Sequence, residues 1–262
     1  MKTKDIVRQS VNVIATLVTL AVNGLANGLP LNGLTTGEIS DSFDVFFVPA
    51  GYVFSIWGLI YLGLLAFTVY QALPSQRDNP RLQRVGYLYA LSGAANSAWI
   101  FLWHYQRFPL TLLVMLILLG SLIAVYLRLG IGRSEVSTAE RWAVRVPISI
   151  YLGWISVATV ANATSLLDFL DWGGWGIAPD IWALIMLVIA AGIASVVIFT
   201  RRDVAYGLVF VWAYIGIAVK HMGTLTVSVP AGILAVAIAA MIFVQFWPRG
   251  KDRQLTAQAK AT

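Results

Sequence analysis

The sequence predicts an all-α polytopic membrane helix bundle with about eight transmembrane helices, and three observations support this fold class. Hydrophobic residues make up 59% of the 262 residues and charged residues only 11%, whereas soluble domains contain about 25% charged residues. The mean hydropathy of +0.78 is typical of a chain whose solvent is lipid. Long apolar segments follow one another along the chain, and most charged residues fall between them.

The apolar segments are close to the length that a bilayer requires, about 20 mostly apolar residues per helix. We expect eight spans, at approximately 9–29, 52–73, 86–106, 109–128, 147–167, 181–200, 204–220 and 224–247. Pro, Gly and charged residues separate them. The seventh is the shortest: at about 1.5 Å per residue it reaches little more than 24 Å, so its full crossing is left open.

The basic residues give the bundle an orientation. With the N-terminus in the cytoplasm, the outer loops hold only Arg107 and Lys220, and the other sixteen of the 18 Lys and Arg lie inside. This bias is what the positive-inside rule requires, so both termini are expected to be cytoplasmic and the net charge of +6 reflects topology rather than nucleic-acid binding. The inner residues are Lys2, Lys4, Arg8, Arg77, Arg81, Arg84, Arg128, Arg133, Arg141, Arg145, Arg201, Arg202, Arg249, Lys251, Arg253 and Lys260.

Polar side chains recur on one face of the first predicted helix, with spacings of three and four residues. Two interpretations are open: hydrogen bonds between helices, or one polar wall of a cavity. The residues are Asn12, Thr16, Thr19, Asn23 and Asn27.

The third and fifth predicted helices combine aromatic residues with asparagine. Trp99 and Trp154 lie too deep in their segments for an interfacial aromatic belt alone to explain them. Small residues recur every four positions on the third helix and allow close packing, either within the bundle or between two copies of the chain. These small residues are Gly86, Ala90, Ala94 and Ala98.

Several kinds of chemistry lack their residues. The chain has no cysteine, which excludes disulfides and cysteine-held metals, and no Asp or Glu lies deep in a predicted span. His104 and His221 lie at helix ends, where a structural role is expected rather than ligation of a haem iron. Lys220 has no acidic partner in mid-membrane, which argues against a retinal Schiff base. We therefore expect no metal site and no required cofactor, and no catalytic residue is identified.

Three segments resemble the tryptophan-rich sensory protein family, also called TspO/MBR or translocator protein. LYALSGAANSAW at 88–99 resembles the family's LYxxQLxLNxxW, and YLGWISVATVAN at 151–162 resembles YLxWxxFAxxLN. Pro49, Trp57 and Tyr61 resemble the family's PxxxF…VWxxLY stretch. The sequence departs from the family at Ser55 and Ser92, and the loop at 30–51 lacks the KPxWxPP motif.

The resemblance covers about residues 9–167 and implies a division of the chain into three parts. Residues 1–168 would form a TspO-like five-helix unit, and 169–247 would add three transmembrane helices, as in longer bacterial relatives. Residues 248–262 would form a short polar cytoplasmic tail. An integral protein of the bacterial cytoplasmic membrane is expected.

The resemblance also implies a cavity for a hydrophobic small molecule, a porphyrin or a sterol-like compound, with haem another candidate ligand. A membrane receptor is expected first, while a small-molecule transporter and a light-dependent porphyrin-degrading protein remain alternatives. A homodimer is compatible with the small-residue row. The candidate ligand-binding residues are Trp57, Tyr61, Asn96, Trp99, Trp103, Trp154, Ala158 and Asn162.

Overall fold

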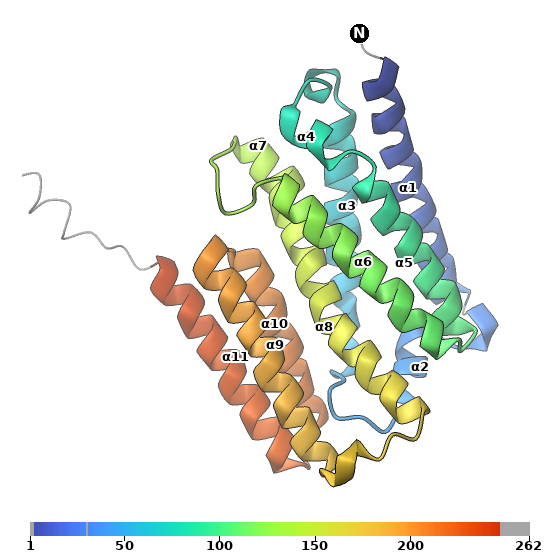
Figure 1. The fold of residues 1–262 in the computed structure, drawn as a ribbon, viewed down its shortest axis with the longest axis vertical. Helices are drawn as coiled ribbons and strands as arrows, with labels where there is room; N and C mark the ends of the chain where they lie inside the picture. The colour runs from blue at the N-terminus through green and yellow to red at the C-terminus, as the bar shows by residue number, and fades with distance from the viewer. Residues whose placement is uncertain (1–2, 30, 247–262) are drawn as a thin grey trace, which may run out of the picture.

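A computed structural model of the chain describes residues 3–29 and 31–246. These residues form a bundle of long helices, and the described part contains no β-strand. The tail expected at 248–262 lies outside the described residues. The long apolar helices confirm the predicted fold class, an all-α membrane helix bundle, and Figure 1 shows how they are arranged.

Each of the eight predicted segments contains a long helix. Six helical stretches are long and apolar enough to cross a membrane, whereas α5 and α10 have 17 residues each, or about 25 Å. The number of helices that cross the bilayer thus stays a prediction. The eight are α1 (Thr3–Gly28), α3 (Ile56–Ala72), α5 (Leu88–His104), α6 (Phe108–Arg128), α8 (Val146–Phe169), α9 (Pro179–Arg201), α10 (Val204–Lys220) and α11 (Leu225–Phe246).

Short elements connect the long helices. They are the 3-10 helices η1 (Leu31–Gly33), η2 (Gly51–Ser55), η3 (Pro74–Gln76) and η5 (Gly174–Gly176), the α-helices α2 (Thr36–Asp41), α4 (Pro80–Val85) and α7 (Thr138–Glu140), and the π-helical turn η4 (Arg141–Arg145). Through α7 and η4, the helix around the fifth predicted segment extends over Thr138–Phe169 and so begins before the apolar residues.

The helices form two groups that meet along α8. The first contains α1, α3, α5, α6 and α8, and the second contains α9, α10 and α11 (Figure 1). α10 approaches α8 closely at Gly153, where a Cβ atom would lie only 3.1 Å from the carbonyl oxygen of Tyr206. Glycine at this position therefore allows the two groups to pack backbone against backbone.

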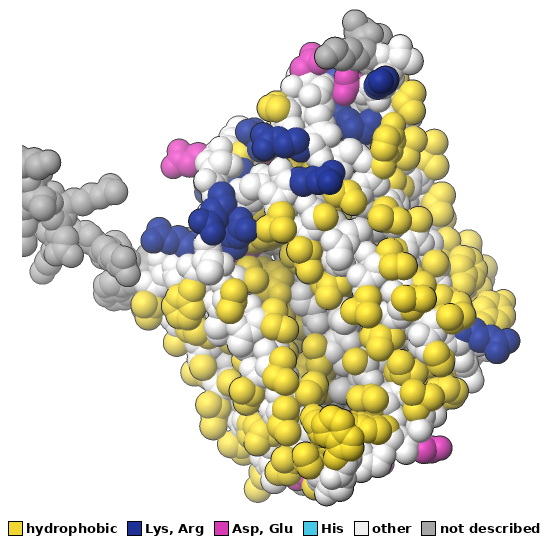
Figure 2. All heavy atoms as spheres, in the orientation of Figure 1, with side chains coloured by type: hydrophobic (Ala, Val, Ile, Leu, Met, Phe, Trp, Pro, Cys, Tyr) yellow, Lys and Arg dark blue, Asp and Glu magenta, His cyan; other side chains and the backbone are white. Residues whose placement is uncertain are grey.

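Charged and apolar side chains divide the surface into zones. Lys and Arg gather at the end that carries the N-terminus, α4 and α7, and apolar side chains cover most of the remaining face that Figure 2 shows. Many large apolar residues, such as Leu62, Val196 and Val236, are more than 60% exposed. An exposed apolar belt of this extent is expected where lipid replaces water around the protein.

The row of small residues on α5 faces outward. Ala94 and Ala98 are exposed and Ala90 is half-buried, so this row does not pack inside the bundle. The close approach within the bundle occurs instead at Gly93, where a Cβ atom would lie 2.8 Å from the Thr19 hydroxyl oxygen of α1. The exposure of Ala94 and Ala98 argues against packing within the bundle, and contact with a second copy of the chain stays a prediction.

Candidate ligand-binding site

Five aromatic side chains from η2, α3 and α8 form one cluster. The rings of Trp57 and Tyr61 stack with centroids 5.5 Å apart, since four residues along a helix bring two side chains onto one face. Trp154 meets the edge of Trp57 with centroids 6.3 Å apart. The α3–α8 aromatic cluster consists of Phe54, Trp57, Tyr61, Tyr151 and Trp154.

A pair of tryptophans on α5 forms a second group. The rings of Trp99 and Trp103 are stacked with centroids 5.1 Å apart, and both side chains are almost fully buried. Trp99 Nε1 donates a hydrogen bond to Asn162 on α8, and Trp103 Nε1 donates to the backbone carbonyl of Thr36 on α2. This pair is therefore held by hydrogen bonds that are already made within the protein.

Asn96 of α5 joins this helix to α1. Its Oδ1 accepts a hydrogen bond of 2.6 Å from Nδ2 of Asn23, and its side chain is fully buried. The remaining amide group, Nδ2, makes no hydrogen bond of good geometry within the described residues, and the Tyr151 hydroxyl of α8 is the polar group that faces Asn96. The Trp154 indole nitrogen, one turn further along α8 than Tyr151, has no hydrogen-bond partner among the described residues. Trp154 Nε1 is thus a buried donor of the α3–α8 aromatic cluster that no group in the described part of the chain engages.

The polar face of α1 joins helices together. Thr16 lies 2.7 Å from the Tyr89 hydroxyl of α5 and 2.6 Å from the Thr68 hydroxyl of α3. Thr19 donates to the Gly93 carbonyl on α5. Of the two interpretations of this face, interhelical hydrogen bonding therefore describes these side chains.

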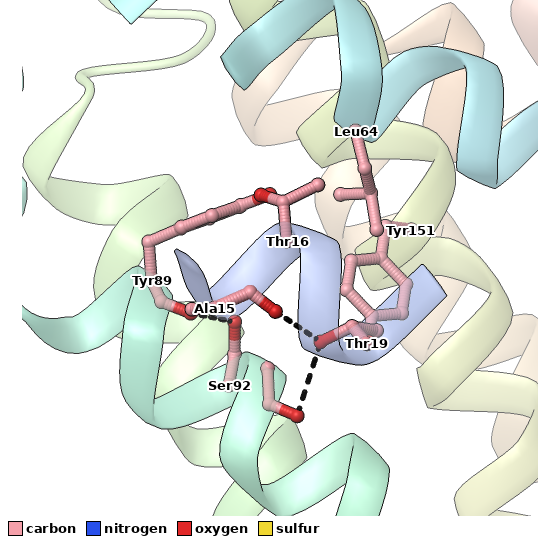
Figure 3. A pocket seen from close by; sticks show the side chains of 8 residues that line it. Ala15, Thr16, Thr19, Leu64, Tyr89, Ser92 and Tyr151 are labelled. Atoms are coloured by element: carbon pink, nitrogen blue, oxygen red, sulfur yellow. Dashed lines mark hydrogen bonds between the residues drawn. The ribbon is translucent and has the colours of Figure 1, made fainter. Parts of the chain in front are cut away.

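A niche of about 10 Å³ lies beside this polar face. Figure 3 shows the side chains that line it, among them Thr19 of α1, Tyr151 of α8 and Tyr89 of α5, whose side chain reaches toward Thr16. This volume is close to the smallest that holds one water molecule. A polar pocket of this size suits a bridging water and is too small for a hydrophobic ligand.

A larger cavity, of about 340 Å³, lies where the first group of helices meets α9. The segment at 44–47, the last turns of α8, the loop at 172–177 and the first turns of α9 form its walls. Its lining includes two carboxylates, Asp44 and Asp168, and two indoles, Trp172 and Trp182. We did not anticipate this cavity from the sequence, although the loops at 30–51 and 168–180 both carry acidic residues and no Lys or Arg.

Both histidines and Lys220 have structural surroundings. His104 is buried, with Nε2 3.1 Å from the Thr36 hydroxyl and Nδ1 2.9 Å from the Leu31 carbonyl, so both ring nitrogens are occupied. His221 packs edge-on against Phe46. Lys220 forms an ion pair with Asp41. No group of three residues that could hold a metal ion occurs in residues 3–29 and 31–246.

The structure brings the predicted ligand-binding residues together in two groups. Trp57, Tyr61 and Trp154 belong to the α3–α8 aromatic cluster, and Trp99 and Trp103 belong to the α5 pair with Asn162. Asn96 lies beside Tyr151 and joins α5 to α1. Ala158 is half-buried on α8, between Trp154 and Asn162 along the helix.

Comparison with known proteins gives one match. A family model described as TSPO-like protein matches residues 9–244, which reach from α1 into α11. The match therefore includes α9, α10 and α11, beyond the residues 9–167 that carry the sequence resemblance. No curated protein and no solved structure matches the chain.

Proposed function

Because the chain belongs to the TSPO-like protein family, we propose that this membrane protein binds a flat hydrophobic ligand, with a porphyrin as the first candidate. The coarser function, a membrane protein that binds or transports a ligand, follows from the family. A receptor role, a porphyrin and the site residues are our proposal. A sterol-like compound is the competing ligand.

The observation that carries this proposal is the buried, unpaired indole donor of Trp154 within the aromatic cluster, one turn along α8 from the Tyr151 hydroxyl that faces the Asn96 amide. Trp154 Nε1 is buried without a hydrogen-bond partner among the described residues, whereas the Asn96 amide and the Tyr151 hydroxyl face each other. Burying an unpaired polar group costs about 1–3 kcal/mol, and few native groups remain so. A ligand with acceptor atoms would offset that cost.

A porphyrin has both features that these residues would bind. Its faces are large and aromatic, and its ring nitrogens and carboxylates accept hydrogen bonds. Trp57 and Tyr61 are only half-buried, so the α3–α8 aromatic cluster has an edge that its own side chains leave uncovered. Stacking on that edge would place an acceptor near Trp154.

The other predicted residues would hold the helices around the site in place. Trp99, Trp103 and Asn162 are buried and hydrogen-bonded to protein groups, and Ala158 gives room beside Trp154. We propose that they fix the position of α5 against α8. They would contact the ligand only where it extends past Asn96.

The experiment is a titration of the purified protein in nanodiscs with protoporphyrin, followed by tryptophan quenching and by the porphyrin absorbance. We expect saturable binding that weakens about tenfold in Trp154→Phe, because this variant keeps a ring but loses the Nε1 donor. Trp142→Phe is the matched control, since Trp142 is 65% exposed. Partitioning without saturation would refute the proposal.

Transport and sensing are separated by a second measurement. Protein in sealed liposomes would move porphyrin into the lumen only if it is a transporter, whereas a receptor binds it without net flux. No described feature favours transport specifically. Binding without flux is therefore the expected result.

The proposed orientation places both termini in the cytoplasm of a bacterial cell. It rests on the basic residues gathered at one end of the bundle (Figure 2). The chain has no cysteine, so single cysteines can report on each side without background. We expect Gln83→Cys to be labelled from the cytoplasm and Gly173→Cys from outside.

A further inference from the structure

We propose that the 340 Å³ cavity between α8 and α9 is a second binding site, specific for a small organic cation that carries an aromatic or aliphatic group. This site is separate from the porphyrin site proposed above. It uses residues of α9 and of the loop before it. The proposal rests on the shape, charge and aromatic lining of the cavity.

The cavity combines an apolar surface with two carboxylates. Its volume falls within the range of about 300–1,000 Å³ that is typical of small-molecule sites. None of the residues that line it is Lys, Arg or His. The residues that the argument uses are Asp44, Phe46, Phe47, Asp168, Trp172 and Trp182.

The two carboxylates are not neutralised by protein groups. Within the described part of the chain, the side chains of Asp44 and Asp168 form no ion pair and no hydrogen bond, whereas Asp41 in the same loop pairs with Lys220. His221 packs on Phe46, and burial lowers the pKa of its imidazole, so this neighbour is uncharged at neutral pH. The cavity therefore carries negative charge that a bound cation would balance.

Two indole rings form the other half of the site. The rings of Trp172 and Trp182 lie 5.2 Å apart at an angle of 55°, and an ammonium group is attracted to such ring faces. Trp182 Nε1 donates a hydrogen bond of 2.8 Å to the Gly174 carbonyl, which fixes its ring. Gly174 has a φ of +60°, and a Cβ atom there would lie 3.1 Å from that nitrogen, so this turn requires glycine.

The chemistry favours an organic cation over a metal ion. A divalent cation needs about six oxygen ligands, and the cavity offers two exposed carboxylates beside indole and phenyl rings. These rings supply no oxygen ligands to a metal ion, whereas an ammonium group with apolar substituents can pack directly against them. Carboxylates and aromatic faces together are the recognition pattern for quaternary ammonium groups.

The test uses benzyltrimethylammonium as the probe and neopentylbenzene, its neutral isostere, as the matched ligand. Binding is measured by calorimetry on the full chain in nanodiscs of zwitterionic lipid, with empty nanodiscs subtracted. We expect saturable binding of the cation and at least tenfold weaker binding of the isostere. Equal binding of the two compounds would overturn the proposal.

The variants separate charge from fold. Asp44→Asn with Asp168→Asn should weaken cation binding about tenfold, and Trp172→Leu should weaken it severalfold. Asp171→Asn is the control: it removes a charge from the same loop outside the cavity, and asparagine tolerates the φ of +50° there. An equal loss in the control, or binding of calcium in place of the probe, would refute the site. If the double variant unfolds, Trp172→Leu decides the test.

Discussion

Trp99 and Asn162 form a hydrogen bond across the bundle, with Nε1 of the indole 3.0 Å from Oδ1 of the amide. The same amide donates through Nδ2 to the Thr111 hydroxyl of α6, 2.9 Å away. One buried side chain thus joins α5, α6 and α8. In a lipid environment no bulk water replaces these bonds, so their loss leaves polar groups unpaired.

Asn162→Ala is expected to lower the free energy of unfolding by about 1–3 kcal/mol, because it leaves the Trp99 indole without an acceptor and removes the hydrogen bond that the Thr111 hydroxyl accepts. Thermal unfolding in detergent measures this. Asn27→Ala is the control, since Asn27 is exposed and donates only to a carbonyl of its own helix. Equal destabilisation by both substitutions would contradict the role of the α5–α8 bond.

A second prediction concerns the basic end of the bundle, where Arg81 binds Glu140. Nε and Nη2 of Arg81 each lie 2.6 Å from a carboxylate oxygen of Glu140, whose side chain is only 3% exposed. Arg81→Lys keeps the positive charge but loses the bidentate hydrogen bonding to the carboxylate. We therefore expect the free energy of unfolding to fall by about 1–2 kcal/mol.

The matched control for that ion pair is Arg84→Lys. Arg84 is exposed, and its Nε donates to the Pro80 carbonyl of its own helix. We expect this variant to unfold within about 0.5 kcal/mol of the wild type. If Arg84→Lys costs as much as Arg81→Lys, the pairing of α4 with α7 has no special importance.

The third prediction tests the contact between the two groups of helices. Gly153→Leu would push a side chain into the Tyr206 carbonyl and Val209 of α10, so overpacking should cost about 1–3 kcal/mol. Gly58→Leu, at a position where a Cβ atom meets nothing within 4 Å, is the control. Limited proteolysis should also release α9–α11 faster from Gly153→Leu than from the control.

The sequence alone predicts much of this fold because lipid imposes simple rules. Helix length and apolar content locate all eight long helices, and three- and four-residue spacings locate the buried face of α1 except at Asn27, which is exposed. The Asn and Trp residues singled out on α5 and α8 do lie together in pairs, as Trp99 and Asn162 demonstrate.

The remaining features depend on contacts between distant segments, which spacing does not encode. The 340 Å³ cavity combines loop 44–47 with the start of α9, more than 120 residues later in the chain. Asp203 also appears in the sequence as a loop residue, but it is 7% exposed and accepts hydrogen bonds from Tyr126 and Ser149 of two other helices. Only the tertiary arrangement reveals these partners.

The last prediction concerns pH and His221, which follows α10. Burial lowers the pKa of this imidazole below its ordinary value of 6.5, backbone hydrogen bonds with Val48 and Phe46 oppose the shift, and the charge of Lys220 adds to it. The folded state therefore favours the neutral ring. Above about pH 6.5 both states hold it neutral, and as the pH falls below that value the unfolded chain binds the proton more readily.

Stability should consequently fall as the pH drops from 7.5 to 5.5. The comparison with His221→Asn isolates this residue, because asparagine cannot take up a proton and keeps a side-chain group that can meet the backbone at Val48. We expect the melting temperature in detergent to fall less steeply with pH in the variant than in the wild type. Parallel curves would show that the pKa of His221 is the same in the folded and the unfolded state. The burial of His221 against Phe46 would then have no energetic consequence.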